Sequence, residues 1–413
     1  MTDLKVKILY LHQYFTTPDC NGGTRSYEMA KRFIRNGHKV TFVTSSAFFS
    51  NKSIFNQGWN ELEIEGIRLF VLHLPYSNKD SYISRISKFL NFSVRATIKA
   101  LAIQADVVLA TSTPLTIAVP GVIYSKIKGV PMVFEVRDLW PELPVAVGAL
   151  KNRLAIRMAT WLELFAYRNA KRLIGLSPGM CDGIIRTGIE PERVILVTNS
   201  CDTELFDVPS SIGDVYKSEK MPFVGQRKLI VYTGTFGIIN NVKYMVDLAH
   251  AASVNRMNLC FVAIGDGMQK EDVLTYAKEK NVLDINFYVL DAVPKTEIVS
   301  LLSAADLALS LFGPIKEMWH NSANKLFDAL ASSTPIAINY GGWQQELIEK
   351  HRCGVVLDAH NVAESALLLN KFLFDENQYK HATRACHDLA YSKYSRDIMA
   401  TKLEQALVQA IND

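Results

Sequence analysis

Short apolar runs that end in small polar residues recur along the whole chain. They lie at residues 7–12, 40–45, 105–110, 130–136, 173–176 and 194–197, and again at 229–233, 259–264, 285–290, 306–311 and 336–339. Segments with apolar residues at helical spacing follow several of them, for example at 24–34, 242–251 and 295–304. Buried strands that alternate with helices are typical of parallel sheets. The pattern therefore predicts an α/β protein with two successive Rossmann-like sheets, closed by helices at 379–389 and 396–411.

A polar stretch at 209–226, with two prolines and two glycines, separates the two series of strands and is the best candidate for a linker. The chain has 413 residues, of which 49% are hydrophobic. This length is too great for one core and favours two domains of roughly 200 residues each. We expect the N-terminal sheet to end near residue 206.

The overall charge and the cysteines exclude several classes of protein. The 45 basic and 41 acidic residues nearly cancel, which argues against a nucleic-acid-binding protein. The six cysteines are scattered singly, so we expect reduced thiols and no zinc site or disulfide framework. The first residues lack the apolar region of a signal peptide, and no run approaches the roughly 18 apolar residues of a membrane span. A soluble or peripheral cytoplasmic protein is expected.

Two adjacent glycines, Gly22 and Gly23, precede the first predicted helix. Glycines at a helix N-terminus allow backbone N–H groups to approach an anion or a sugar closely, although a tight turn would use them equally well. The spacing is not GxGxxG, and no acidic residue follows the second strand at 44–46. Both departures argue against a dinucleotide site.

Charged residues stand at the carboxyl end of another predicted strand, where Arg137 and Asp138 follow residues 130–136. Charge at the edge of a buried strand is costly unless it is paired or used. The two residues therefore indicate either a ligand site, because open α/β sheets bind ligands at this edge, or a structural Arg–Asp pair.

The helix predicted to begin at Asn324 carries Lys325 and Asp328 on neighbouring turns. A cation and a carboxylate three residues apart at a helix start could hold a phosphate and a sugar hydroxyl, and the helix N-terminus would add its own positive end. The alternative is a solvated pair on an ordinary surface helix. Two small-residue loops, at 234–237 and 265–267, follow earlier strands of the same half.

Two segments, 84–103 and 153–172, place arginines and lysines among apolar residues at helical spacing. Such cationic amphipathic faces can lie on anionic lipid, but surface helices of α/β proteins often have the same pattern. Contact with a membrane surface and an ordinary surface position both remain open.

Six motifs in colinear order resemble glycosyltransferase family 4. They are Gly-Gly-Thr-Arg-Ser-Tyr-Glu-Met-Ala-Lys, Glu-Val-Arg-Asp-Leu-Trp-Pro-Glu, Asn-Ser-Cys-Asp-Thr-Glu-Leu-Phe, Tyr-Thr-Gly-Thr, Ile-Gly-Asp-Gly and Asn-Lys-Leu-Phe-Asp-Ala-Leu-Ala. They look most similar to WbuB-like members, which decorate bacterial surface polysaccharides. Each motif is weak alone, but together they span nearly the whole chain.

The resemblance implies a GT-B fold, in which two Rossmann-like domains face each other across a cleft. It implies an N-terminal acceptor domain over 1–206, completed by a C-terminal helix at 392–413 that crosses back to it, and a donor domain over 207–391. It also implies a retaining transfer from a nucleotide-diphosphate sugar, UDP-linked, to a lipid-linked saccharide acceptor. The resemblance places this reaction in the biosynthesis of O-antigen, and so of lipopolysaccharide, or of capsule or exopolysaccharide. It also implies a cytoplasmic protein at the inner face of the plasma membrane.

Carried onto this sequence, the resemblance assigns catalytic roles to three residues, Arg137, Asp138 and Lys325. It assigns donor binding to a larger set: Gly22, Gly23, Gly234, Thr235, Gly265, Asp266, His320, Asn324 and Asp328. In this comparison Asp328 matches the second acidic residue of a Glu-x7-Glu motif that holds ribose hydroxyls.

The sequence departs from the family pattern at three places. Arg137 replaces the histidine of a His-Asp pair, His320 replaces the first acidic residue of Glu-x7-Glu, and Asn240 and Asn241 replace a Lys-Gly. Without that lysine, we expect Lys325, with Arg137, to supply the cation for the diphosphate. No Asp-x-Asp motif is present, so we expect neither a metal nor another cofactor. Whether His320 contacts the ligand or is a polar surface residue stays open.

Two other functions remain compatible with the sequence. One is a nucleotide-sugar epimerase of GT-B fold, which would hydrolyse the sugar nucleotide without an acceptor. The other is a non-catalytic nucleotide-binding assembly subunit, which would bind nucleotide without turnover.

Overall fold

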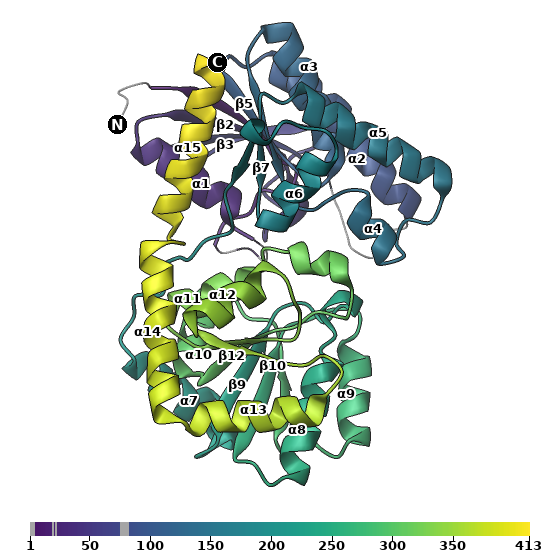
Figure 1. The fold of residues 1–413 in the computed structure, drawn as a ribbon. Helices are drawn as coiled ribbons and strands as arrows, with labels where there is room; N and C mark the ends of the chain where they lie inside the picture. The colour runs from purple at the N-terminus through teal and green to yellow at the C-terminus, as the bar shows by residue number, and fades with distance from the viewer. Residues whose placement is uncertain (1–4, 19, 21–22, 75–81) are drawn as a thin grey trace. The chain divides into compact units, whose positions relative to one another are not determined.

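The computed structural model describes residues 5–18, 20, 23–74 and 82–413. The chain separates into two compact units: unit 1 comprises 1–198 with 396–413, and unit 2 comprises 199–395. The boundary expected near residue 206 thus lies inside unit 2. Each unit is described by itself below (Figure 1).

Unit 1 contains one eight-stranded sheet in its described part. Its strands are β1 (Lys7–Leu11), β2 (Lys39–Ser45), β3 (Trp59–Ile64), β4 (Ile67–Leu72), β5 (Val107–Thr111), β6 (Met132–Val136), β7 (Arg172–Gly175) and β8 (Val194–Leu196). The spatial order is β3-β4-β2-β1-β5-β6-β7-β8, and only the β3–β4 pair is antiparallel among these neighbours. The central strands β1, β5 and β6 are almost entirely buried, which is why they read as continuous apolar runs.

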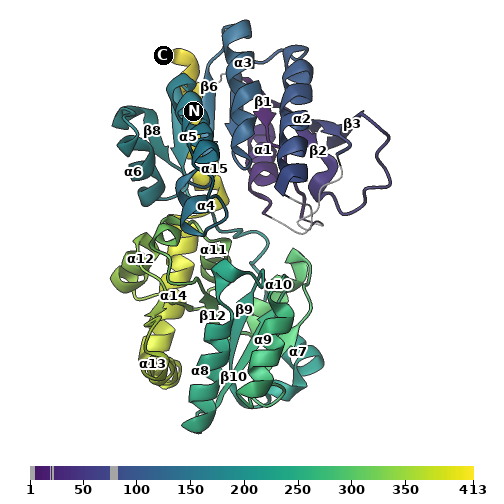
Figure 2. The ribbon, with the colours of Figure 1, turned by 90° about the vertical axis from the view of Figure 1, so that its right-hand side faces the viewer.

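Helices cover both faces of this sheet. They are α1 (Arg25–Arg35), α2 (Tyr82–Leu101), α3 (Ala118–Lys128), α4 (Glu142–Ala146), α5 (Arg153–Asn169), α6 (Pro178–Arg186) and α15 (Arg396–Asn412). Helix α3 packs between α2 and α5, so these three form one layer (Figure 2). Helices α1 and α15 contact each other and lie on the sheet, the yellow α15 beside the purple α1 in Figure 1.

The C-terminal helix is tied to unit 1 by charged contacts on α1. Arg396 Nη1 lies 2.9 Å from Glu28 Oε1, and Arg32 Nε lies 2.5 Å from Asp397 Oδ1. Arg32 also pairs with Glu28 at 2.8 Å. Ion pairs that are partly buried and share partners resist solvent screening better than isolated surface pairs. The expected return of the last helix to the N-terminal part is therefore present in unit 1.

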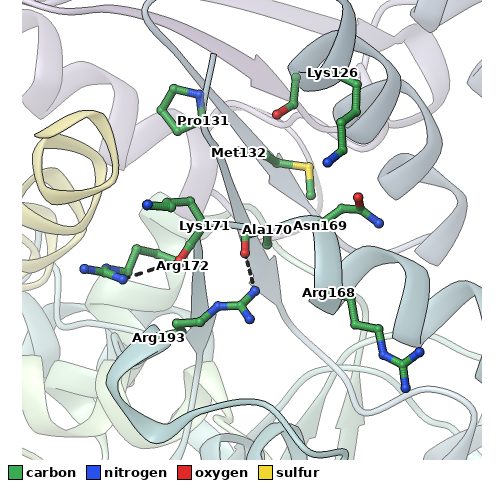
Figure 3. Close-up of a pocket in the computed structure, with 10 residues that line it drawn as sticks. Lys126, Pro131, Met132, Arg168, Asn169, Ala170, Lys171, Arg172 and Arg193 are labelled. Atoms are coloured by element: carbon green, nitrogen blue, oxygen red, sulfur yellow. Dashed lines mark hydrogen bonds between the residues drawn. The ribbon is translucent and has the colours of Figure 1, made fainter. Parts of the chain in front are cut away.

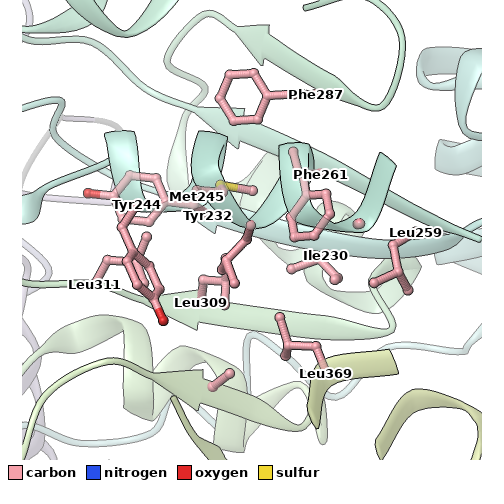
Figure 4. Close-up of a cluster of buried hydrophobic side chains, with 14 of the residues drawn as sticks. Ile230, Tyr232, Tyr244, Met245, Leu259, Phe261, Phe287, Leu309, Leu311 and Leu369 are labelled. Atoms are coloured by element: carbon pink, nitrogen blue, oxygen red, sulfur yellow. The ribbon is translucent and has the colours of Figure 1, made fainter. Parts of the chain in front are cut away.

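Unit 2 contains a six-stranded parallel sheet of order β11-β10-β9-β12-β13-β14. The strands are β9 (Lys228–Thr233), β10 (Leu259–Ile264), β11 (Phe287–Leu290), β12 (Leu307–Ser310), β13 (Ile336–Ile338) and β14 (Gly354–Val356). Side chains from β9, β10, β12 and the helix α8 (Lys243–Val254) form a dense core that includes Ile230, Phe261, Leu309 and Met245 (Figure 4). This core fixes the strand ends that carry the candidate site.

The remaining helices of unit 2 are α7 (Ser211–Lys220), α9 (Lys270–Glu279), α10 (Lys295–Ala304), α11 (Asn324–Ala331), α12 (Trp343–His351), α13 (Val362–Phe374) and α14 (Glu376–Ser392). The expected linker at 209–226 is wrong, because α7 lies within it and packs on α10. The Tyr216 hydroxyl donates to Glu297 Oε1 at 2.9 Å, and a Cβ on Gly213 would lie 2.4 Å from the Ser303 backbone. A helix so polar is stabilised by its partner more than by its own pattern.

Candidate functional site

The loops that follow β9 and β10 touch each other at the carboxyl edge of the unit 2 sheet. Gly234 N donates to Ile264 O at 2.9 Å, and a Cβ on Gly265 would lie 1.8 Å from Gly234 O. The φ angles of Gly234 and Gly265 are +141° and +154°, in a region that side-chain-bearing residues rarely adopt. Both glycines are therefore required for this close backbone approach.

Lys325, on the first turn of α11, extends to the same loops. A Cβ atom added to Gly234 would lie 3.1 Å from Lys325 Nζ. The same Nζ lies 5.1 Å from the centre of the Tyr232 ring. Within the described residues, this ammonium makes no ion pair and no conventional hydrogen bond. Burial lowers the pKa of Lys325 to about 8, although the Asp328 carboxylate opposes the shift. The site thus holds a cation without a full counter-charge, which is the arrangement expected for binding an anion.

The start of α11 is held in place by Asn321. Asn321 Oδ1 accepts hydrogen bonds from Ala323 N and from Gln344 Nε2, both at 2.9 Å. The residue at the N-cap position, Ala323, has no side chain that could cap the helix. Leu326 N donates to Ala323 O at 3.2 Å, so within the described residues the N–H groups of Asn324 and Lys325 are left for solvent or a ligand, next to the Lys325 ammonium.

Asp328 pairs with Lys295, the first residue of α10, and not with Lys325. The solvated Lys325–Asp328 pair considered from the sequence is therefore absent, because a lysine from another helix occupies the carboxylate. Asp328 keeps 15% of its side-chain surface exposed. Its role in holding ribose hydroxyls stays a prediction.

Four further residues expected at the donor site lie on the same edge of the sheet, but they differ in exposure and in their hydrogen bonds. Thr235 is exposed, and its carbonyl accepts from the Tyr232 hydroxyl at 2.8 Å. Asp266 is exposed, and its Oδ1 accepts from Gly267 N at 2.8 Å, so it shapes its own turn. Asn324 is exposed at the start of α11, and His320 ends the short helix η6 (Lys316–His320) just before it.

Unit 1 has its own polar cluster at the carboxyl edge of its sheet. His12, directly after β1, is buried; its Nδ1 lies 2.9 Å from Ser26 Oγ and its Nε2 lies 3.5 Å from Arg137 Nη1. Arginine can only donate, so the Nε2 lone pair accepts and Nδ1 carries the proton. Burial and the neighbouring Arg137 charge hold the pKa of His12 well below its usual value. His12 is therefore a neutral acceptor that orients Arg137.

Arg137 and Asp138 do not pair with each other in the described structure. The Arg137 backbone N donates to Ser112 Oγ at 3.0 Å, and Thr113 Oγ1 donates to Asp138 Oδ2 at 3.1 Å. Burial raises the pKa of Asp138, while Arg137 and Thr113 lower it in part. The structural Arg–Asp pair considered from the sequence is thus not formed, and both charged groups are available at this edge.

Of the two glycines before α1, Gly22 lies outside the described residues. Gly23 lies beside the helix start, where its carbonyl accepts from Thr16 Oγ1 at 2.8 Å. The first residue of α1, Arg25, enters the core, and its Nε and Nη2 donate to Glu135 Oε2 at 3.0 and 2.8 Å. This pair fixes the start of α1 against β6.

Two residues of these clusters were not predicted from the sequence: His12 in unit 1 and Lys295 in unit 2. His12 follows the same rule as Arg137, a polar residue directly after a buried strand, and that rule could have found it. Lys295 gave no signal of this kind, because its partner Asp328 is distant in sequence and the pair forms only when α10 and α11 are folded.

The described residues hold no group of three or more His, Cys, Asp and Glu side chains that could bind a metal ion. The expectations of no metal and no other cofactor stay predictions.

Two protein-family models match the chain, one for each half. The Glycosyl transferase 4-like domain matches residues 22–200, and Glycosyl transferases group 1 matches residues 217–387. The chain therefore belongs to the glycosyltransferases that combine these two domains, which supports the resemblance to family 4. The closer resemblance to WbuB-like members stays a prediction.

Individual relatives agree with this assignment. The chain is 26% identical to the probable glycosyltransferase WbjE of Pseudomonas aeruginosa over 271 residues, which are 61% of this chain and 64% of WbjE. The matched region is thus less than two thirds of that relative. The crystal structure of Anabaena HepE in complex with UDP-glucose has a TM-score of 0.71 and 17% identity, and covers 98% of this chain and 100% of HepE.

The crystal structure of WaaG, a glycosyltransferase involved in lipopolysaccharide biosynthesis, is similar to the same extent. It has a TM-score of 0.68 and 16% identity, and covers 97% of this chain and 99% of WaaG. At these identities the structures establish the fold alone. They confirm the predicted GT-B class with two Rossmann-like domains.

Proposed function

We propose that the protein transfers a sugar from a UDP-linked donor to a lipid-linked saccharide acceptor, with retention of anomeric configuration. The acceptor would be an intermediate of O-antigen, capsule or exopolysaccharide. The observation that carries the proposal is Lys325, a cation without a paired carboxylate that lies against the Gly234 loop and the uncapped start of α11. The crystal structure of HepE in complex with UDP-glucose supports the class of donor.

The proposed chemistry is electrostatic. Cleavage of the bond between sugar and diphosphate places negative charge on the leaving phosphate and positive charge on the sugar. Lys325 and the first N–H groups of α11 would stabilise the leaving phosphate. In unit 1, Arg137 is oriented by His12 and Asp138 accepts a hydrogen bond from Thr113; their catalytic roles stay predictions. No metal is required in this scheme.

Calorimetric titration of the protein with UDP, GDP and dTDP, each with and without EDTA, tests the proposal. We expect tight binding of UDP that EDTA does not change, and weaker binding of GDP and dTDP. Binding of none of the three would overturn the donor site. Tight binding without sugar transfer to any lipid-linked acceptor would support the assembly subunit in place of the transferase.

Donor binding is expected to weaken above about pH 8. The pKa of Lys325 is lowered to about 8, so the free protein loses this positive charge as the pH rises through that value. If the diphosphate binds only the charged form, affinity falls by about tenfold per pH unit above the pKa. UDP affinity measured between pH 7 and 10 tests this, with a Lys325→Met variant, whose affinity should not change across the same range, as control.

The proposed acceptor and the proposed peripheral position agree with one exposed face of unit 1. Helix α2 exposes Ile86, Leu90, Val94 and Ile98, which are spaced four residues apart and so lie along one side of the helix. Ile98 is 68% exposed. Arginines and lysines are interleaved with these residues, at 85, 88, 95 and 99. An apolar stripe among cations is suited to the interface of an anionic lipid surface.

None of the helices in the described part of the chain is long and apolar enough to cross a membrane. The exposed apolar surface leads us to propose contact through α2, together with the exposed Leu154, Met158 and Trp161 of α5, on the other side of α3.

Replacing Leu90, Val94 and Ile98 with Ser is expected to weaken binding to anionic vesicles by roughly tenfold or more, since each loses the burial of an apolar side chain. Sedimentation with phosphatidylglycerol vesicles measures the effect. A triple Ser variant of Val254, Ile285 and Leu367, which are equally exposed on unit 2, serves as the matched control. Equal loss in both variants would argue against the α2 face.

A further inference from the structure

Unit 1 contains a second polar site, at the edge of the sheet opposite to Arg137. A pocket of about 420 Å³ lies at the amino ends of β6 and β7, where α3 and α5 end. Its volume falls within the range of about 300–1,000 Å³ that is typical of small-ligand pockets. Five basic residues line it, and we call it the basic pocket: Lys126, Arg168, Lys171, Arg172 and Arg193 (Figure 3).

Two of these five cations have carboxylate partners. Arg172 pairs with Asp413, and Arg193 pairs with Glu190 at 2.9 Å. Arg193 Nη2 also donates to the carbonyl of Tyr167, in the last turn of α5, and to that of Ala170, which directly follows the helix. Figure 3 shows the contact with Ala170. Capping of α5 and pairing with Glu190 therefore account for Arg193.

In the part of the chain that the structure describes, the other three cations have no carboxylate partner; Lys126 and Arg168 are exposed, and Lys171 is half-buried. Lys126, Arg168 and Lys171 make no side-chain ion pair or hydrogen bond within the described residues. Arg172 Nε, in the same pocket, is buried without an acceptor. A buried donor and three uncompensated cations around one cavity favour an anion with several oxygen acceptors, and a phosphate group has that chemistry.

The apolar surface next to the basic pocket indicates what carries the phosphate. On α5 the exposed residues Leu154, Met158 and Trp161 are followed at helical spacing by Arg168, so one side of the helix runs from apolar to basic. On α3 the exposed Ile127 follows Lys126 directly. An apolar surface that ends in a cationic pocket matches a molecule with acyl chains and a charged headgroup.

We infer that the basic pocket binds the phosphate of an anionic phospholipid headgroup, while the exposed residues of α5 contact the acyl region. The site uses unit 1 alone and does not depend on transfer activity. The basic pocket would determine which lipid headgroups the protein recognises. The α2 surface would add a general attraction to anionic membranes.

A triple variant, Lys126→Gln with Arg168→Gln and Lys171→Gln, tests this inference. The control is Lys220→Gln with Lys278→Gln and Lys371→Gln, which removes the same charge from exposed positions of unit 2. Binding of both variants and the wild-type protein is measured to vesicles of phosphatidylcholine alone and of phosphatidylcholine with phosphatidylglycerol. A basic residue near an anionic surface contributes about fivefold to affinity, so three contribute on the order of a hundredfold.

We expect the pocket variant to lose most of the preference for phosphatidylglycerol and the control to keep it, with UDP affinity equal in all three proteins. An unchanged preference, or an equal loss in the control, would overturn the inference. A parallel titration with inorganic pyrophosphate separates the sources of phosphate. The pocket would be assigned to a soluble anion if pyrophosphate binding needs the three cations and the protein shows no preference for anionic vesicles. That result would overturn the proposal of a phospholipid ligand.

Discussion

Replacing Lys325 with Met is expected to reduce kcat/KM for sugar transfer by about 10²–10³-fold, which is the usual effect of removing one group that stabilises a developing charge. The methionine keeps the length and the apolar stem of the side chain but removes the charge that lies against the Gly234 loop. UDP affinity should fall as well, because the leaving diphosphate and free UDP present similar anionic oxygens.

The same substitution is expected to raise the thermal stability of the protein without ligand. Burial lowers the pKa of Lys325, so the folded state holds the charged form at a cost that the unfolded state does not have. The unfolded chain binds more protons between about pH 8 and the usual lysine value, so the free energy of unfolding of the wild-type protein rises with pH across that window. Loss of activity together with a higher Tm would distinguish a missing ligand contact from misfolding.

Lys280 provides a matched control for Lys325. It is also partly buried in unit 2, and its Nζ lies 5.3 Å from the Tyr276 ring centre and 3.9 Å from Asp247 Oδ1, but it follows α9 directly, away from the strand ends of the site. The Lys280→Met variant is expected to keep both UDP affinity and kcat/KM. A Lys325→Met protein with the activity of the wild type would disprove the role of this cation.

Replacing Arg25 with Met is expected to destabilise unit 1 by about 3–5 kcal/mol, because it leaves a buried carboxylate unpaired. Glu135 is completely buried in β6, and its Oε2 accepts two hydrogen bonds from Arg25. Arg25 also donates to the carbonyls of Val197 and Thr198, which lose their partner in the variant. Hydrogen–deuterium exchange of β6 and α1 measures this loss in unit 1 separately from unit 2.

The double variant Arg25→Met with Glu135→Leu tests the cause. Removal of both charges should restore part of the protection, because the unpaired carboxylate is gone. The free energy of unfolding of unit 1 should stay about 1–3 kcal/mol below that of the wild type, since two backbone carbonyls remain without donors. Equal protection in the single and double variants would show that the carboxylate is not the source of the loss.

The fold could be predicted from the sequence wherever a buried strand ends in a small polar loop. This rule located β1, β6, β9 and β10, and with them Arg137, Gly234 and Gly265, because parallel strands are apolar along their length and expose their carboxyl ends together. It failed for α7, whose few apolar residues acquire a role only against α10. It also gave no hint of the antiparallel β3–β4 pair.

In the polar clusters of both units, single residues were easier to predict than their partners. Lys325 was proposed from its place at a helix start. Its separation from Asp328 was not foreseeable, because Lys295 arrives from another helix. His12 and Arg137 are 125 residues apart, and no local pattern relates them. Pairings of this kind follow from the packing of whole elements.

The membership of α15 in unit 1 sets an order for the folding of the nascent chain. Residues 396–413 complete unit 1 but are translated after all of unit 2. Until they emerge from the ribosome, Arg32 and Glu28 of α1 lack Asp397 and Arg396, and the sheet surface under α15 is uncovered. Unit 2 can therefore finish folding first, and translation that stops shortly before Arg396 would yield a folded unit 2 attached to an incomplete unit 1, a substrate for chaperones and proteases.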